Sequence, residues 1–141
     1  MSEPFAWEHR IRVDEIDAAG IVFFARYFQW CHEAMATMLD AIAGGYASLI
    51  LARRIGFPTV HAEADYKAPL RYGDTVRIDV TVEKIGTSSC SLRFDLRRSA
   101  SALPVAVVRH VVVSSDVDAM RSTPIPDDVR AVLVRHAAAV A

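Results

Sequence analysis

The chain has 141 residues, 52% of them hydrophobic, and a formal net charge of -1 at pH 7. This length and composition predict a single domain over residues 1–141 that is large enough to bury a core. The nearly neutral charge and the lack of a long basic run argue against a nucleic-acid partner. The apolar stretches are shorter than the roughly 18 residues needed to cross a bilayer, and the first residues lack a signal-peptide pattern. We therefore expect a cytoplasmic protein with no membrane partner.

The first half of the chain predicts one strand and two helices. Apolar and polar residues alternate over residues 5–13, as in a half-buried strand. Apolar residues then recur at spacings of three and four over residues 27–42, which predicts a helix of about five turns that ends at Gly44-Gly45. A second, short helix is expected over residues 46–55.

The second half predicts strands. Alternating patterns over residues 60–67, 76–83 and 90–96 each indicate a strand, and the last two form a hairpin. Residues 105–113 are almost continuously apolar, which predicts a central strand buried on both faces. A short terminal helix is expected to begin at residues 126–128. One long helix followed by several strands favours an antiparallel α+β domain over a parallel nucleotide-binding sheet.

Asp17 is the most informative residue. It lies in an otherwise apolar and small-residue segment, residues 16–24, just before the predicted long helix. A helix N-terminus offers unpaired N–H groups and a partial positive charge, so an acid beside it could take part in catalysis. The small residues 18–20 would let another group approach the backbone. On spacing alone, a role for Asp17 as a simple helix cap or loop residue is favoured.

Other kinds of chemistry lack a motif. No glycine-rich phosphate-binding loop occurs, so we expect no nucleotide cofactor. Cys31 and His32 are adjacent on a helix and point about 100° apart, so they do not form a nucleophile and base. The two cysteines are widely separated, and no two histidines have the i, i+4 spacing of a helical metal site, so we expect no metal and no disulfide.

The segment from Asp17 to Phe24, followed by Tyr27, resembles the signature of the 4-hydroxybenzoyl-CoA thioesterase family. The resemblance continues through residues 57–62 and 68–74 and so covers most of the chain. It implies the hotdog fold, in which a curled antiparallel sheet of about five strands wraps a long central helix. It also implies a homodimer or homotetramer, in which sheets pair edge to edge and the active sites form at the protomer interface.

The resemblance further implies roles for individual residues. Asp17 would be the catalytic carboxylate, as nucleophile or general base, and the backbone amide of Phe24 would polarise the thioester carbonyl. Gly20 would allow close approach, and His61 would face the site from the partner protomer. The other substrate-binding residues that it implies are Ile21, Val22, Phe23, Tyr27 and Val60.

Phe24 narrows the expected substrate. Relatives that act on short aliphatic acyl-CoA carry histidine at this position, whereas the aryl-CoA branches carry an aromatic or apolar residue. Residues 31–34 and 58–61 also resemble 1,4-dihydroxy-2-naphthoyl-CoA thioesterases. The expected function is hydrolysis of a hydroxybenzoyl- or hydroxynaphthoyl-like acyl-CoA to free acid and CoA, with no cofactor. The alternatives are a short- or medium-chain aliphatic acyl-CoA thioesterase, a hotdog hydratase, for which no motif is present, and a non-catalytic acyl-CoA-binding protein.

Overall fold

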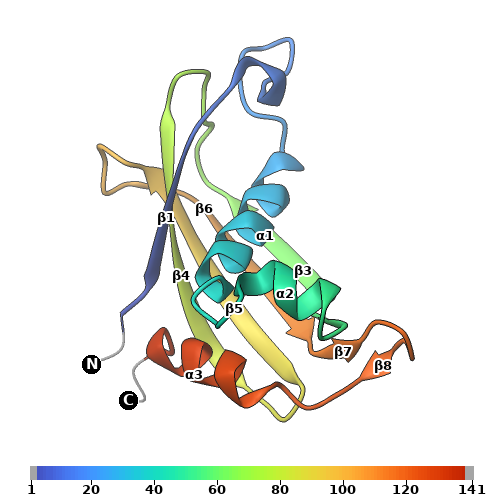
Figure 1. The fold of residues 1–141 in the computed structure, drawn as a ribbon. Coiled ribbons are helices and arrows are strands. Elements are labelled where there is room, and N and C mark those ends of the chain that lie inside the picture. Colours follow the sequence, from blue (N-terminus) through green and yellow to red (C-terminus); the bar gives the residue numbers. More distant parts are fainter. Residues whose placement is uncertain (1–2, 139–141) are drawn as a thin grey trace.

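The computed structural model describes residues 3–138, in which a curved sheet wraps one long helix (Figure 1). In chain order the elements are β1 (Phe5–Arg10), the 3-10 turn η1 (Val13–Glu15), α1 (Arg26–Leu39), α2 (Gly45–Leu51), β2 (Ile55–Gly56), β3 (Thr59–Tyr66), β4 (Thr75–Ile85), β5 (Ser89–Arg98), β6 (Pro104–Val113), β7 (Ser115–Asp116), β8 (Arg121–Ser122) and α3 (Asp127–Arg135). None of these helices is long and apolar enough to span a membrane.

The main sheet has five antiparallel strands in the order β1-β4-β5-β6-β3, which confirms the predicted α+β class and strand number. Buried and partly exposed residues alternate along β4 and β5, so one face of the sheet packs inward and the other meets solvent. β2, β7 and β8 form a separate small sheet. The two edges of the main sheet are therefore β1 and β3.

α1 packs across the inner face of the sheet. Its buried side chains are Tyr27, Trp30, Cys31, Ala34, Met35, Met38 and Leu39. Their spacing of three and four residues places them on one side of the helix, against buried residues of the strands such as Leu92 and Phe94. Each large apolar side chain that is fully buried stabilises the fold by roughly 1.5 to 3 kcal/mol. This packing fixes the direction in which the N-terminal end of α1 points.

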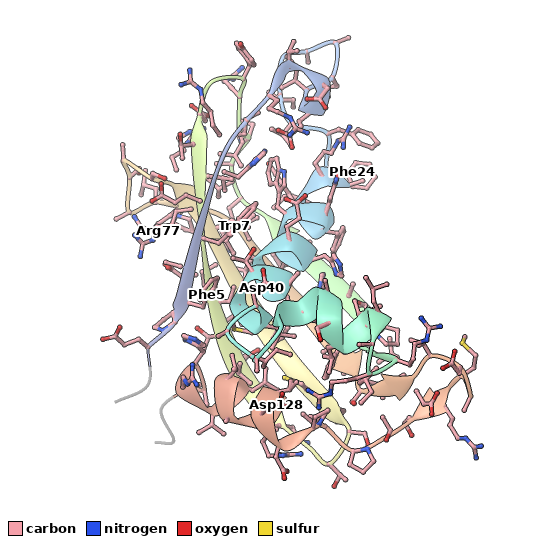
Figure 2. The ribbon with its side chains drawn as sticks, viewed as in Figure 1. Phe5, Trp7, Phe24, Asp40, Arg77 and Asp128 are labelled. Carbon is pink, nitrogen blue, oxygen red and sulfur yellow. The ribbon has the colours of Figure 1, made fainter. Side chains whose placement is uncertain are left out.

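The predicted start of the long helix is within one residue of the observed one, but the predicted C-terminal end is three residues too late. The helix has 14 residues, Arg26–Leu39, and Figure 2 shows Phe24 near its N-terminal end and Asp40 at the other. The predicted end was too late because Ile42 continues the apolar spacing and is buried, although the helix has already ended. Asp40 Oδ1 accepts a hydrogen bond from Tyr46 N at 2.9 Å, and Gly44 has a left-handed φ of 81° and opens α2. The expected helix over 46–55 is shorter, Gly45–Leu51.

The burial of β6 and β3 differs from that of strands covered on both faces. The central strand predicted over 105–113 is an interior strand, β6, but it is not buried on both faces. Val107 and Val111 lie on the outer face and are only half-buried, because no helix within residues 3–138 covers that side (Figure 1). In β3 every residue except Ala64 is exposed, and Ala64 packs against the core, so this edge strand is largely uncovered among residues 3–138. The predicted terminal helix is confirmed as α3, with Val129, Val132 and Leu133 buried.

Candidate active site

Asp17 heads a tight turn in the loop between β1 and α1. Its N–H donates to the carbonyl of Ile21 at 2.8 Å, and the Gly20 N–H donates to the carbonyl of Asp17 at 3.0 Å. Asp17 Oδ1 accepts a hydrogen bond from the Ala19 N–H at 2.8 Å. Gly20 has a φ of 79°, a left-handed conformation that favours glycine, and the space around its Cα is open. The carboxylate of Asp17 is therefore held by the turn and exposed to solvent.

The prediction that Asp17 stands at the helix entrance, as a possible cap, is wrong. α1 begins at Arg26, and its N-cap is Ala25, whose side chain makes no capping hydrogen bond. Residues 18–20 form a turn, and the chain then runs through an extended pair at 21–22, where Val22 pairs with Ile16 and its N–H donates to the carbonyl of Leu70 at 2.8 Å. Asp17 therefore belongs to the loop that precedes the helix, not to its first turn.

Glu15 anchors the loop, and the sequence reasoning missed it. Its side chain is 3% exposed, and Oε1 lies 2.7 Å from His9 Nε2 and accepts from Arg12 N at 2.8 Å. Oε2 accepts from Trp30 Nε1 at 2.7 Å. Burial alone would raise the pKa of Glu15, but these hydrogen bonds outweigh it and hold the pKa below its ordinary value. The backbone carbonyl of Glu15 also accepts from the Phe23 N–H at 3.1 Å, so this acid fixes the chain on both sides of Asp17.

Two adjacent amides stay free at the entrance of α1. The carbonyl of Phe23 accepts from Arg26 N at 2.9 Å, and that of Phe24 accepts from Tyr27 N at 3.4 Å. Within residues 3–138 the N–H groups of Phe24 and Ala25 have no intramolecular acceptor. They lie at the positive end of the helix, where unpaired N–H groups favour a negatively charged oxygen. This geometry suits the oxyanion role predicted for the Phe24 amide, which stays a prediction.

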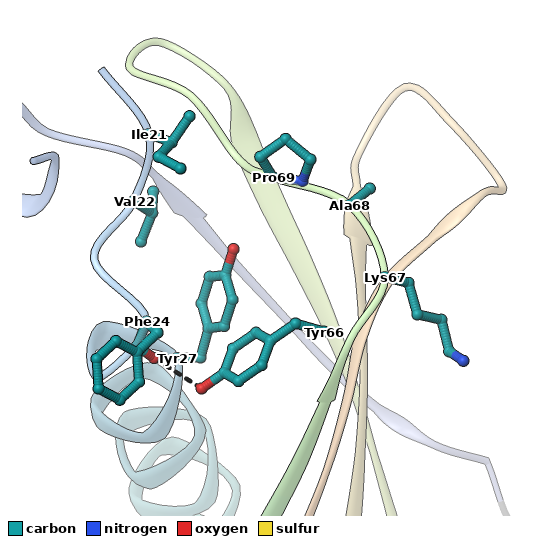
Figure 3. A pocket seen from close by; sticks show the side chains of 8 residues that line it. All are labelled: Ile21, Val22, Phe24, Tyr27, Tyr66, Lys67, Ala68 and Pro69. Carbon is teal, nitrogen blue, oxygen red and sulfur yellow. Dashed lines mark hydrogen bonds between the residues drawn. The ribbon is translucent and has the colours of Figure 1, made fainter. Parts of the chain in front are cut away.

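A cavity of about 340 Å³ opens beside the helix entrance (Figure 3). Its lining residues are Ile21, Val22, Phe24, Tyr27, Tyr66, Lys67, Ala68 and Pro69. The wall is mainly apolar, and three aromatic rings contribute to it. Burial raises the pKa of both Tyr27 and Tyr66, so their hydroxyls are protonated and can donate hydrogen bonds at neutral pH. The cavity can hold a flat apolar group next to free backbone donors.

The cavity brings together four of the predicted site residues, namely Ile21, Val22, Phe24 and Tyr27. The others lie outside its wall. Asp17 and Gly20 are in the turn, and Phe23 is an exposed neighbour of Phe24, with ring centroids 4.9 Å apart.

Val60 and His61 lie on the exposed edge strand β3 and also do not line this cavity. His61 Nε2 is 3.8 Å from Glu63 Oε1, and both side chains are exposed. A role for either residue stays a prediction.

Four residues at the end of β3 line the cavity but were not predicted, Tyr66, Lys67, Ala68 and Pro69. The only sign of this segment in the sequence was the resemblance of residues 68–74 to the thioesterase family. Among the described residues no group of three or more His, Cys, Asp or Glu side chains could hold a metal ion. The expectation that no cofactor is needed stays a prediction.

Comparison with known proteins supports the fold class that the curved sheet and the long helix define. The profile of the Thioesterase-like superfamily matches residues 11–133. The chain is 33% identical over 111 residues to a 1,4-dihydroxy-2-naphthoyl-CoA hydrolase of Prochlorococcus marinus (strain NATL2A), a match that covers 74% of this chain and 72% of that protein. A hydrolase of the same name from Nostoc punctiforme is 28% identical over 125 residues, 89% of this chain and 83% of that protein. The chain belongs to the Thioesterase-like superfamily.

Solved structures confirm the hotdog fold. A gentisyl-coenzyme A thioesterase superposes with a TM-score of 0.79 at 30% identity, over 89% of this chain and 98% of that one. A 1,4-dihydroxy-2-naphthoyl-CoA thioesterase from Synechocystis gives a TM-score of 0.84 over 92% of this chain and 95% of that one, at 23% identity. The resemblance stated from the sequence motifs is thereby confirmed.

Proposed function

We propose that this protein hydrolyses the thioester of an aromatic acyl-CoA, of the hydroxybenzoyl or hydroxynaphthoyl kind, to the free acid and CoA. Its relatives are thioester hydrolases, and those named above act on aromatic acyl-CoA esters. The observation that carries the proposal is the pair of free amides, Phe24 and Ala25, at a helix entrance beside a cavity walled by aromatic rings. The cytoplasmic location and the homo-oligomer expected from the sequence belong to the same proposal.

In this mechanism the two free amides stabilise the negative charge that forms during the reaction. When a nucleophile adds to the thioester carbon, negative charge develops on the carbonyl oxygen, and preorganised N–H donors stabilise it. The N–H groups of Phe24 and Ala25 are already unpaired, so no internal hydrogen bond has to break when the oxygen arrives. Collapse of the adduct then expels CoA as its thiolate.

Asp17 supplies the nucleophilic step by one of two routes. Its Oδ1 accepts from Ala19 N, and Oδ2 has no partner among residues 3–138. Oδ2 can attack the thioester carbon to form a mixed anhydride, which water then hydrolyses, or it can accept a proton from a water that attacks directly. Both routes consume one water and yield the acid and CoA.

The aromatic preference follows from the walls and size of the cavity. Phe24, Tyr27 and Tyr66 offer ring faces and edges that pack against a planar aromatic acyl group. A volume of about 340 Å³ is near the lower limit for ligand pockets, which suits one or two fused rings better than a long fatty chain.

We further propose that a second copy of the chain completes the site. Among residues 3–138 β3 is an edge strand whose outer edge is unpaired, with Val60 63% exposed, and such an edge readily pairs with another strand. Asp17 and His61 do not line the cavity of their own protomer. Pairing β3 with its counterpart in a homodimer would cover Val60 and bring side chains of both protomers to each cavity.

The proposal is tested by a panel of benzoyl-, hydroxynaphthoyl-, butanoyl- and palmitoyl-CoA, followed by release of free thiol. We expect kcat/KM for the aromatic esters to exceed that for the aliphatic ones by at least about tenfold, or roughly 1.4 kcal/mol of transition-state binding. Equal rates on all four esters would contradict the aromatic preference. Tight binding without turnover would instead support the non-catalytic alternative.

Val60→Lys tests the dimer. Placing a charge on the exposed edge strand should prevent strand pairing, so we expect light scattering to report a monomer where the unaltered protein is a dimer or tetramer. Because the site would then lack its second copy, kcat/KM should fall by at least roughly a hundredfold.

The matched control is Val134→Lys, since Val134 is similarly exposed but lies on α3. It should leave both the molar mass and the activity unchanged. An unaltered protein that is monomeric and fully active would refute the interfacial site.

A further inference from the structure

The hydroxyl of Tyr66 donates a hydrogen bond to the carbonyl of Phe24 at 2.9 Å (Figure 3). This contact joins the last residue of β3 to the turn that enters α1, across 42 positions of sequence. The accepting carbonyl belongs to the peptide whose N–H is that of Ala25, one of the two free donors. The bond therefore acts on the same peptide unit that the proposed mechanism uses.

The ring of Tyr66 is held firmly enough to direct its hydroxyl. Its centroid is 5.0 Å from that of Tyr27, which is buried, and 6.5 Å from that of Phe24 in an edge contact. The backbone on either side is fixed as well, because Tyr66 pairs with Ala106 and Lys67 N donates to the carbonyl of Val105 at 2.8 Å. A hydroxyl held in this way restricts the orientation of the peptide that it contacts.

A hydrogen bond to the carbonyl of a peptide also makes its N–H a better donor, because hydrogen bonds in a chain polarise one another. The Phe23 carbonyl accepts from Arg26 N in the same manner and acts on the peptide that carries the Phe24 N–H. Each of the two free amides thus has its carbonyl end bonded: the Phe23 carbonyl accepts from Arg26 N, and the Phe24 carbonyl accepts from Tyr27 N at the longer distance of 3.4 Å and from the Tyr66 hydroxyl. Within residues 3–138, the Tyr66 hydroxyl is the one donor to these two carbonyls that comes from outside the helix entrance.

We propose that Tyr66 is a positioning residue for the thioesterase reaction, which orients and polarises the Phe24-Ala25 peptide so that its N–H meets the developing oxyanion. This inference rests on the proposed function. Because β3 is also the exposed edge strand, Tyr66 would connect the subunit contact to the oxyanion donors.

Tyr66→Phe tests the inference, because phenylalanine keeps the ring contacts with Tyr27 and Phe24 and removes only the donor. We expect kcat on the best aromatic ester to fall about tenfold while KM stays within about twofold, since the bond acts in the transition state rather than in substrate binding. Tyr72→Phe is the matched control, as Tyr72 is 61% exposed and lies outside the cavity wall; it should leave both constants unchanged.

A second variant separates positioning from simple support of the fold. A fluorinated tyrosine at position 66 keeps the hydroxyl and the fold, but its phenol ionises at a lower pH and then cannot donate. We expect kcat of this variant to decline with rising pH where the unaltered enzyme and a fluorinated Tyr72 variant do not. A purely structural role for the hydroxyl would not produce this new dependence.

The outcomes are distinct. An unchanged kcat in Tyr66→Phe, or a change confined to KM, would overturn the positioning role while leaving the proposed function in place. If Tyr66→Phe does not fold, the pH profile of the fluorinated variant decides the question alone, and a profile identical to that of the unaltered enzyme would overturn the inference. An unaltered protein with no turnover on any CoA ester would refute the proposed function itself.

Discussion

Replacement of Asp17 by asparagine is expected to reduce kcat by at least roughly a hundredfold while leaving the fold intact. The turn should survive, because an asparagine side-chain oxygen can still accept the hydrogen bond from the Ala19 N–H. What is lost is the second carboxylate oxygen and the negative charge, which the proposed mechanism needs either to attack the thioester or to accept a proton from water. The measurement is thiol release from an aromatic acyl-CoA, together with the melting temperature.

Asp14→Asn is the matched control for this experiment. Asp14 is an exposed acid in the same loop, paired with Arg12 at 3.1 Å, and it has no role in the proposed reaction. We expect its activity to stay within about twofold of the unaltered enzyme, since exposed ion pairs contribute little. Activity of Asp17→Asn within about tenfold of the unaltered enzyme would sink the catalytic assignment of Asp17.

An isotope experiment on the unaltered protein can distinguish the two routes proposed for Asp17. In a single turnover in oxygen-18 water, hydrolysis of a mixed anhydride at the Asp17 carbon would leave the label on Asp17. Direct attack of water on the thioester would place the label only in the released acid. Mass spectrometry of the peptide that contains Asp17 reads out the difference.

The fold was predictable because its strands alternate. In β4 and β5 the side chains that point inward are apolar and those that point outward are polar, so the period of two is visible without any knowledge of partners. Helix ends were less predictable. Ile42 continues the apolar spacing of α1 although it lies beyond the helix, because burial is decided by packing and not by helical conformation.

The site was predictable only where a local motif carried it. Ile21, Val22, Phe24 and Tyr27 lie in one short segment and do reach one cavity. Tyr66 was not found, since it meets Phe24 through strand pairing between distant parts of the chain.

Glu15 was missed for the same physical reason. Two of its partners, His9 and Trp30, lie on different elements, β1 and α1, and their convergence depends on the packing of the helix against the sheet. A pattern of nearby residues shows an acid in a loop and gives no sign that it is buried. Long-range polar contacts of this kind need the folded chain to be recognised.

Glu15→Ala is expected to be the most destabilising single change at the site. Removing the carboxylate leaves the Trp30 N–H and the Arg12 N–H buried or partly buried without an acceptor, and it opens space beneath the loop. Each buried donor left without an acceptor typically costs about 1 to 3 kcal/mol, so the two together should lower the free energy of unfolding by about 2 to 6 kcal/mol. Urea unfolding measures this cost, and Glu8→Gln, at an exposed acid of β1, should change stability by less than about 0.5 kcal/mol.

The pH dependence gives a sharper test through Glu15→Gln. Because the pKa of Glu15 is lower in the folded protein than its ordinary value of 4.5, the unfolded chain binds the proton more readily. The carboxylate therefore contributes stability above about pH 4.5, and that contribution is lost as the pH falls through the lowered folded value. Glutamine cannot ionise and presents one N–H₂ group to donors that need an acceptor, so it should cost about 1 to 3 kcal/mol at pH 7.

We expect the stability gap between the unaltered protein and Glu15→Gln to narrow in acid, and a gap that is constant down to pH 3 would contradict the role of the ionised carboxylate. Since the Glu15 carboxylate also anchors the loop that carries Asp17, through Arg12 N and Trp30 Nε1, the variant should lose activity along with stability at pH 7.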